Sequence, residues 1–302
     1  MHVSSVLVYG GCSVAIIWSN KVILTEYGLS PVSLMFLQNA FTVIAMLIMH
    51  VMGYIKLKLP NLSTFNLLIG TSIINVMNTF VGLGGTALIN AAMFTTLRRI
   101  GIGMTMILET LFLGINHKSS IKVSIYLIII GTIIAALDDL TFNLVGYTYT
   151  MINNALTAGS QIVTKKYIDK HNENGKEMVC FYTSIIGLVT CSIYLYVYQT
   201  ELILTVKSIT MFYNNLEYMN ALIASTILGL ILNLSINWCI DRNDPLTLSV
   251  TGSIKNILVM ILSCIGFIGR DYKYSICNFI GLQVATIGSI MYMYMVAKVK
   301  TS

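Results

Sequence analysis

The chain has 302 residues, of which 56% are hydrophobic and 10% are charged, and its formal net charge is +6. A soluble domain carries about 25% charged residues, so this composition excludes an ordinary soluble protein. It fits an all-α membrane protein, because about 20 consecutive apolar residues cross a bilayer as a helix.

Apolar stretches in chain order predict ten membrane-spanning helices. They lie near residues 3–25, 31–53, 63–84, 88–114, 121–139, 144–166, 177–199, 218–240, 247–268 and 275–297. Together they use almost the whole length and leave no room for a soluble domain. The first stretch has no basic region before it and no small-residue cleavage site after it, so it predicts a span and not a cleaved signal.

Basic residues are distributed unequally between the predicted loops. One set of loops, with the C-terminus, holds eleven of them: Lys56, Lys58, Lys118, Lys122, Lys165, Lys166, Lys170, Lys176, Arg242, Lys298 and Lys300. The other set holds three: Lys207, Arg270 and Lys273. The positive-inside rule therefore places both termini in the cytosol and supports an even number of spans.

Five spans on each side of a join near residues 140–145 predict two halves, 1–140 and 141–302, within one integral membrane domain. Because five is odd, two related halves would be inverted in the membrane. Inverted repeats place a binding site near the middle of the membrane, between the halves. Span four carries Arg98 and Arg99 and span nine carries Lys255 at a comparable depth, which is consistent with such a repeat.

Four basic residues lie inside or at the rim of predicted spans: Lys21, Arg98, Arg99 and Lys255. A cation near the bilayer centre costs about 2.5–3.5 kcal/mol, so it usually faces a cavity and meets an anion. Few acids lie nearby: Glu109, Asp138 and Asp139. The excess of positive charge predicts a phosphorylated ligand. Two alternatives stay open, a salt bridge of Lys255 with Asp241 or Asp138 and a snorkelling role for Lys21.

Polar residues recur at helical spacing in three spans. The stripes are Asn153, Thr157, Ser160 and Thr164; Thr71, Asn75 and Asn78; and Asn233, Asn237 and Asp241. Each stripe occupies one helix face, and hydrogen bonding between helices is the alternative to a ligand. Together with the four cations, the stripes predict a shared aqueous cavity.

No metal or cofactor site is predicted. The six cysteines form no C-x-x-C pair, and none of the four histidines has a partner at ligand spacing. The sequence has no Walker motif, and it has no cluster of acids and bases that a membrane-embedded transferase would need.

Several segments resemble nucleotide-sugar transporters of the drug/metabolite transporter superfamily. They are "SNKVILTEYGLSPVSLMFLQ" (19–38), "MFTTLRRIGIGMTMILETLFLG" (93–114), "LDDLTFNLVGYTYTMINNALTA" (137–158), "TGSIKNIL" (251–258) and "NFIGLQVATIGSIMY" (278–292). The similarity is greatest to carriers of UDP-glucuronate, UDP-N-acetylgalactosamine and UDP-N-acetylglucosamine. It implies a ten-helix fold in Golgi or endoplasmic reticulum membranes. It also implies exchange of a cytosolic nucleotide sugar for a luminal nucleoside monophosphate by alternating access.

The GDP-mannose carriers of this family have an F-Y-N-N motif on span seven. A literal copy, Phe212–Asn215, lies 40 residues before Gly252 and is interpreted as a decoy. Phe181–Ser184 lies 71 residues before Gly252, which is the family spacing, and has Thr183 and Ser184 in place of the asparagines. The missing amides, and a span-nine lysine one place earlier than in those carriers, favour UDP-sugars. A GDP-sugar remains an alternative.

The resemblance and the intramembrane polar residues together predict the substrate-binding residues. These are Arg98, Arg99, Lys255, Asn256, Gly252, Ser253, Tyr182, Ser184, Asn153, Asn154, Thr157, Asn75 and Asn78. Lys255 and one of the two arginines, of which Arg98 is favoured by alignment with the family, are expected to bind phosphate. Tyr182 and the amides are expected to contact the base and the sugar.

The expected partners are the nucleotide sugar, the nucleoside monophosphate and the lipid bilayer. A homodimer is left open, and no nucleic acid is expected. The main rival is an antiporter of the triose-phosphate or phosphoenolpyruvate type, which shares the fold and the basic cavity. A receptor or scaffold is a further rival, but it would need internal acidic partners for the four cations.

Overall fold

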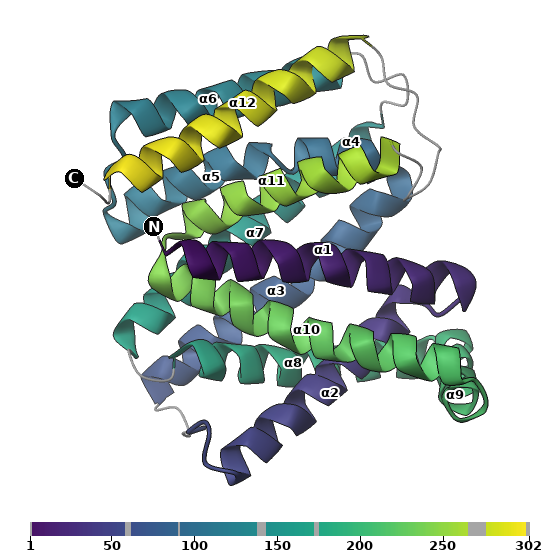
Figure 1. Ribbon diagram of the computed structural model, residues 1–302. Helices are drawn as coiled ribbons and strands as arrows, with labels where there is room; N and C mark the ends of the chain where they lie inside the picture. Colours follow the sequence, from purple (N-terminus) through teal and green to yellow (C-terminus); the bar gives the residue numbers. More distant parts are fainter. Residues whose placement is uncertain are drawn as a thin grey trace. The chain divides into compact units, whose positions relative to one another are not determined.

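The computed structural model describes residues 2–57, 62–89, 91–137, 143–171, 175–264 and 276–299. Over these ranges the chain is helical and contains no strand, which confirms the predicted all-α class (Figure 1). The helices are α1 (Val3–Glu26), α2 (Pro31–Val51), α3 (Leu62–Leu88), α4 (Ala91–Leu97), α5 (Ile100–Leu108), the π-helix η1 (Glu109–Leu113), α6 (Ser119–Leu137), α7 (Leu144–Lys170), α8 (Gly175–Val197), α9 (Gln199–Asn214), α10 (Leu216–Arg242), α11 (Pro245–Cys264) and α12 (Ile276–Val299).

Seven helices in the described part of the chain are long and apolar enough to cross a membrane. They are α1, α2, α3, α6, α8, α10 and α12. The protein is therefore a multi-pass membrane protein. The full count of ten spans and their inverted relation remain predictions.

Two predicted elements differ from the structure. The span predicted as one helix over 88–114 is divided into α4, α5 and η1. The segment 199–214, predicted as a loop, is the helix α9. It escaped prediction because it is short and carries Glu201 and Lys207, so it has no membrane-span pattern. It is held in place by the hydroxyl of Thr205, which lies 2.7 Å from that of Ser33 on α2.

The helices pack into two compact units. Unit 1 comprises Met1–Val6, Met77–Lys166 and Arg242–Ser302, and unit 2 comprises Leu7–Val76 and Tyr167–Asp241. Each unit takes segments from both predicted halves, 1–140 and 141–302. The units are defined by which segments pack together, whereas the halves are defined by an expected internal repeat. The division into units therefore does not test the repeat, which stays a prediction.

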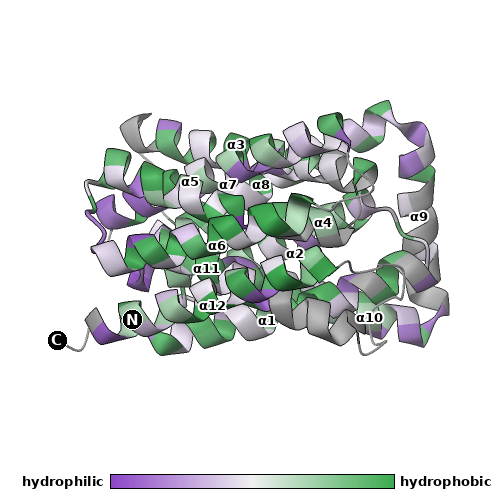
Figure 2. Cartoon of the chain, turned by 90° about the horizontal axis from the view of Figure 1, so that it is seen from above, coloured by the Kyte–Doolittle hydropathy of each residue, from purple (hydrophilic) through white to green (hydrophobic). Residues whose placement is uncertain are grey.

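In unit 1, α6 and α12 lie side by side with their backbones in close contact (Figure 1). A Cβ added at Gly281 would overlap the backbone nitrogen of Ala135, and one added at Gly131 would lie 2.5 Å from that of Ala285. Small residues thus allow the close approach that is common between membrane helices. Figure 2 shows hydrophobic residues over most of the length of both helices.

In unit 2, a polar triad joins α1, α2 and α10. The Ser225 hydroxyl donates to Asn20 Oδ1 over 2.7 Å, and Gln38 Nε2 donates to Asn20 Oδ1 over 3.1 Å and to Ser225 Oγ over 2.8 Å. α2 starts where its sequence predicts, because the Ser30 side chain caps it and Pro31 occupies its first turn. Such interhelical hydrogen bonds hold a bundle together where water is absent.

Candidate functional site

The helix that carries the two arginines is interrupted at Arg98 and Arg99, between α4 and α5. At the interruption the backbone bonds span three residues, from Arg99 N to Thr96 O, from Gly101 N to Arg98 O and from Ile102 N to Arg99 O, each over 3.1 Å. This is a tight turn of the 3₁₀ type. Broken helices at membrane depth are tolerated where they are buried in protein or line a cavity, and they form binding sites in many transporters.

Asn154 of α7 stabilises the interruption. Its Nδ2 donates over 3.0 Å to the carbonyl of Leu97, the last residue of α4. The last carbonyls of a helix have no partner within that helix, so a side chain from another helix can satisfy them. Gly101 leaves room for this contact, since a Cβ there would lie 3.3 Å from Asn154 Cγ. Asn154 was predicted to contact the substrate, and here its amide N–H group positions the arginine turn.

Arg99 is buried in this turn, and no carboxylate among the described residues forms an ion pair with it. Its side chain is 3% exposed, and neither Nε nor Nη1 has a hydrogen-bond partner. A buried guanidinium normally pairs with a carboxylate or phosphate, because desolvation of a bare charge is costly. The buried guanidinium of Arg99 is therefore a candidate to bind an anionic ligand.

Arg98 and Lys255 lie near each other and near the same turn. Arg98 is exposed, and its Cζ lies 5.8 Å from the centroid of the Phe94 ring. It acts on the partly buried Lys255 of α11 as a like charge. Within the described ranges no carboxylate forms an ion pair with Lys255. Three positively charged residues, Arg98, Arg99 and Lys255, thus lie at or near this turn.

The other predicted residues of unit 1 divide into two groups. On α11, Ser253 is buried and its Oγ has no hydrogen-bond partner, and Gly252 precedes it. Between α3 and α7, Asn153 Nδ2 donates over 2.7 Å to both the carbonyl oxygen and the Oδ1 of Asn78, and the Thr157 hydroxyl donates to that Oδ1 over 3.0 Å. Asn78, Asn153 and Thr157 therefore form hydrogen bonds between two helices, which was the alternative to binding a ligand. Asn153 Oδ1 has no hydrogen-bond partner.

Three predicted residues, Asn75, Tyr182 and Ser184, belong to unit 2. Tyr182 packs against the cluster around Leu68 and Tyr167, and its ring meets that of Phe181 edge-on, with centroids 5.5 Å apart. Ser184 is buried, and Asn75 is partly exposed on α3.

The motif Phe212–Asn215, interpreted from the sequence as a decoy in a loop, lies at the end of helix α9. The Oδ1 of its last residue, Asn215, accepts hydrogen bonds from the backbone nitrogens of Glu217 and Tyr218 over 3.0 and 3.1 Å. Asn215 therefore caps the start of α10, which gives it a structural role.

Some positions used in the sequence predictions lie outside the described residues. They are Lys58, Asp138, Asp139, Arg270, Lys273 and Lys300, and the side chains of Lys21, Lys207, Phe212, Tyr213, Asn214 and Asn256.

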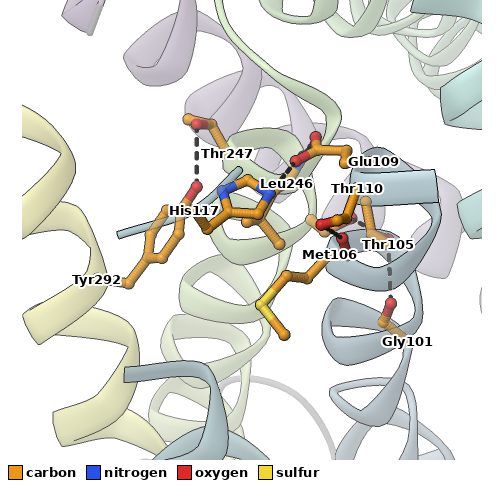
Figure 3. A network of polar contacts seen from close by, with 10 residues as sticks. Gly101, Thr105, Met106, Glu109, Thr110, His117, Leu246, Thr247 and Tyr292 are labelled. Atoms are coloured by element: carbon orange, nitrogen blue, oxygen red, sulfur yellow. Dashed lines mark hydrogen bonds and ion pairs between the residues drawn. The ribbon is translucent and has the colours of Figure 1, made fainter. Parts of the chain in front are cut away.

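A buried carboxylate holds the start of α11 against the end of α5 (Figure 3). Glu109 is fully buried; its Oε1 accepts a hydrogen bond from the backbone nitrogen of Leu246 over 2.7 Å, and its Oε2 lies 3.0 Å from His117 Nε2. Beside them, the hydroxyls of Thr247 and Tyr292 lie 3.3 Å apart. A carboxylate at the N-terminus of a helix is favoured by the helix dipole.

This contact fixes the relative depth of the cation-bearing segments. Arg99 precedes Glu109 by ten residues and Lys255 follows Leu246 by nine, so each cation lies roughly 15 Å along its helical segment from the contact. Sequence reasoning missed the pairing with His117. The chain reverses at Gly114, where φ is +67°, so helical spacing gave no sign of it.

The chain is similar in sequence to known transporters. UDP-sugar transporter UST74c of Drosophila melanogaster is 35% identical over 97% of this chain and 77% of the relative. Nucleotide sugar transporter SLC35D2 of Homo sapiens is 34% identical over 96% of this chain and 85% of the relative. GDP-mannose transporter GONST2 of Arabidopsis thaliana is less similar, at 24% identity over 85% of this chain and 69% of the relative.

A solved structure, titled only as the crystal structure of a protein, covers 99% of both chains with a TM-score of 0.65 and 12% identity, which supports the fold. The molecule is a multi-pass membrane transporter and not an enzyme. It belongs to the Triose-phosphate Transporter family, whose model matches residues 5–293. The nucleotide-sugar transporter resemblance predicted from the motifs is confirmed.

Proposed function

We propose that this protein exchanges a cytosolic nucleotide sugar, specifically a UDP-sugar, for luminal UMP by alternating access. The observation that carries the proposal is the buried guanidinium of Arg99, unpaired at a helix interruption, with Arg98 and Lys255 close by. The similarity to carriers named for UDP-sugars supports the choice of ligand class.

The chemistry of the cluster suits a diphosphate. A guanidinium can grip a phosphate with two donors, and an ammonium meets it as a point charge. Arg98 and Lys255 carry like charges, and a dianion bound near them would be attracted to both. Without a ligand the buried guanidinium of Arg99 would stay unpaired during reorientation, so the return step is expected to need a bound nucleotide.

The proposed base preference rests on the motif at Phe181–Ser184. Thr183 Oγ1 lies 3.3 Å from the Ser72 hydroxyl, and Ser184 is buried, so this segment offers short hydroxyl groups and no amide. The GDP-mannose carriers that the sequence resembles have two asparagines there. We infer that the guanine-reading amides are absent.

We place the protein in the Golgi or endoplasmic reticulum membrane with both termini in the cytosol. The excess of lysine and arginine in one set of loops supports this orientation. Transport of a GDP-sugar, or of a triose phosphate or phosphoenolpyruvate, is the alternative that the following experiment separates.

Competition for uptake into proteoliposomes tests the nucleotide preference. UMP and unlabelled UDP-sugars should inhibit uptake of a labelled UDP-sugar at concentrations at least about tenfold below the concentrations of GMP and GDP-mannose that give the same inhibition. A factor of ten corresponds to about 1.4 kcal/mol, which one or two net hydrogen bonds supply. Triose phosphate and phosphoenolpyruvate serve as controls and should inhibit weakly. Equal or stronger inhibition by the guanosine compounds would disprove the UDP assignment and leave nucleotide-sugar transport intact.

A further inference from the structure

Unit 2 contains a pocket that none of the predicted substrate residues lines. Its volume is about 340 Å³, near the lower end of the ~300–1,000 Å³ range of ligand pockets. Apolar side chains from α1, α2 and α10 form most of its wall, among them Met46, Met49 and Trp238. The first turn of α8 adds two opposite charges, Lys176 and Glu177.

The two charged groups satisfy each other poorly. Lys176 Nζ lies 3.8 Å from Glu177 Oε1, which is longer than a charge-assisted hydrogen bond of about 2.7–2.9 Å. The second carboxylate oxygen, Glu177 Oε2, is buried and has no hydrogen-bond partner in the described structure. An occupant that matches this pair must bring an anionic acceptor for the lysine and an N–H donor for the glutamate.

The apolar wall has the properties of a site for an acyl chain. Met46 and Met49 have flexible, polarisable side chains that adapt to an irregular chain. Two further wall residues, Val8 and Ile231, are each 39% exposed, so the pocket is open to the surroundings of the helices. A tryptophan such as Trp238 is favoured where apolar chains meet polar head groups.

We propose that this pocket binds phosphatidylethanolamine from the surrounding bilayer. The phosphate meets the Lys176 ammonium, the primary ammonium of ethanolamine donates an N–H group to Glu177 Oε2, and acyl chain methylenes lie along the apolar wall. Phosphatidylcholine has no N–H group to donate, and phosphatidylglycerol has no cation for the glutamate. Of these three head groups, only that of phosphatidylethanolamine has both an anionic acceptor and a charged N–H donor.

The chain offers an internal reporter, because it has two tryptophans and only Trp238 lines the pocket. In a Trp18→Phe variant, lipids with brominated acyl chains should quench Trp238 fluorescence. Brominated phosphatidylethanolamine should quench with about tenfold higher apparent affinity than brominated phosphatidylcholine or phosphatidylglycerol, since among the three only its head group can donate an N–H group to the glutamate while its phosphate meets the lysine; tenfold corresponds to about 1.4 kcal/mol. Adding Glu177→Gln should remove that preference.

The matched controls use the same quenching measurement. Adding Glu217→Gln instead, an exposed glutamate outside the pocket, should leave the preference unchanged. A Trp238→Phe variant reports from Trp18, which is 55% exposed, and should be quenched equally by all three lipids. Retained quenching by brominated phosphatidylcholine shows that Glu177→Gln is folded.

Two outcomes would overturn the proposal. Equal quenching of Trp238 by all three lipids would mean that the charged pair selects no head group. Stronger quenching by brominated phosphatidylglycerol than by brominated phosphatidylethanolamine would mean that Lys176 alone determines which head group binds, and that the pocket accepts any anionic lipid. The readout does not depend on transport, so it stands or falls separately from the proposed exchange of nucleotides.

Discussion

Replacement of Arg99 by methionine is expected to abolish nucleotide-sugar exchange while making the folded protein more stable. The guanidinium is buried with Nε and Nη1 unpaired, so its removal relieves a desolvation cost. The same change removes two charge-assisted bonds to phosphate, each worth about 1.5–3 kcal/mol, which lowers substrate affinity at least about a hundredfold. Substrate binding and thermal unfolding of the purified variant measure the two effects.

Opposite changes in stability and activity distinguish a ligand-binding residue from a structural one. Lys255→Met should behave like Arg99→Met, because it removes another cation of the cluster. Lys118→Met, at an exposed lysine after η1, is the matched control and should keep wild-type exchange. A variant of Arg99 that unfolds at a lower temperature, or that still exchanges at the wild-type rate, would refute its role as a phosphate ligand.

Replacement of Glu109 by leucine is expected to destabilise the protein strongly. It leaves two buried donors without their acceptor, the backbone nitrogen of Leu246 and, where it carries the proton, His117 Nε2. Each unsatisfied donor costs about 1–3 kcal/mol, so the summed loss is about 2–6 kcal/mol. Thermal unfolding in detergent, followed by circular dichroism, measures it.

Two further variants of this network separate its parts. Glu109→Gln can still accept the hydrogen bond from Leu246, so it should lose less stability than Glu109→Leu. Glu217→Leu, at an exposed glutamate in the first turn of α10, should change little. If Glu109→Leu unfolds like the wild type, the carboxylate does not hold α11 in place, and the depth of Lys255 must be set by other contacts.

Most helix boundaries could be predicted because they depend on local signals. The span predicted at 31–53 is α2 (Pro31–Val51), since Ser30 caps its start and Gly53, with φ of +80°, lies just beyond its end. The interruption at Arg98 and Arg99 could not be predicted in this way. The residues on both sides form helix readily, and the freed carbonyl of Leu97 is satisfied from another helix, by Asn154.

The sequence indicates which residues are candidates for the site more readily than it indicates the role of each. Cations inside apolar spans are visible in any sequence, so Arg98, Arg99 and Lys255 are candidates from the sequence alone. Which arginine is buried depends on the turn, and the sequence favoured Arg98 as the phosphate ligand. The Nδ2 group of Asn153, a residue predicted to contact the ligand, donates to Asn78, because a polar stripe can face a cavity or a neighbouring helix equally well.

Uptake of a labelled UDP-sugar into proteoliposomes tests the central claim most directly. The purified protein is reconstituted in vesicles that contain UMP or buffer alone, with Arg99→Met as the inactive control. The proposed exchange predicts fast uptake into UMP-loaded vesicles, slow uptake into empty ones and none above background for Arg99→Met. Failure to take up any nucleotide sugar into vesicles loaded with UMP or GMP would contradict nucleotide-sugar exchange by this protein.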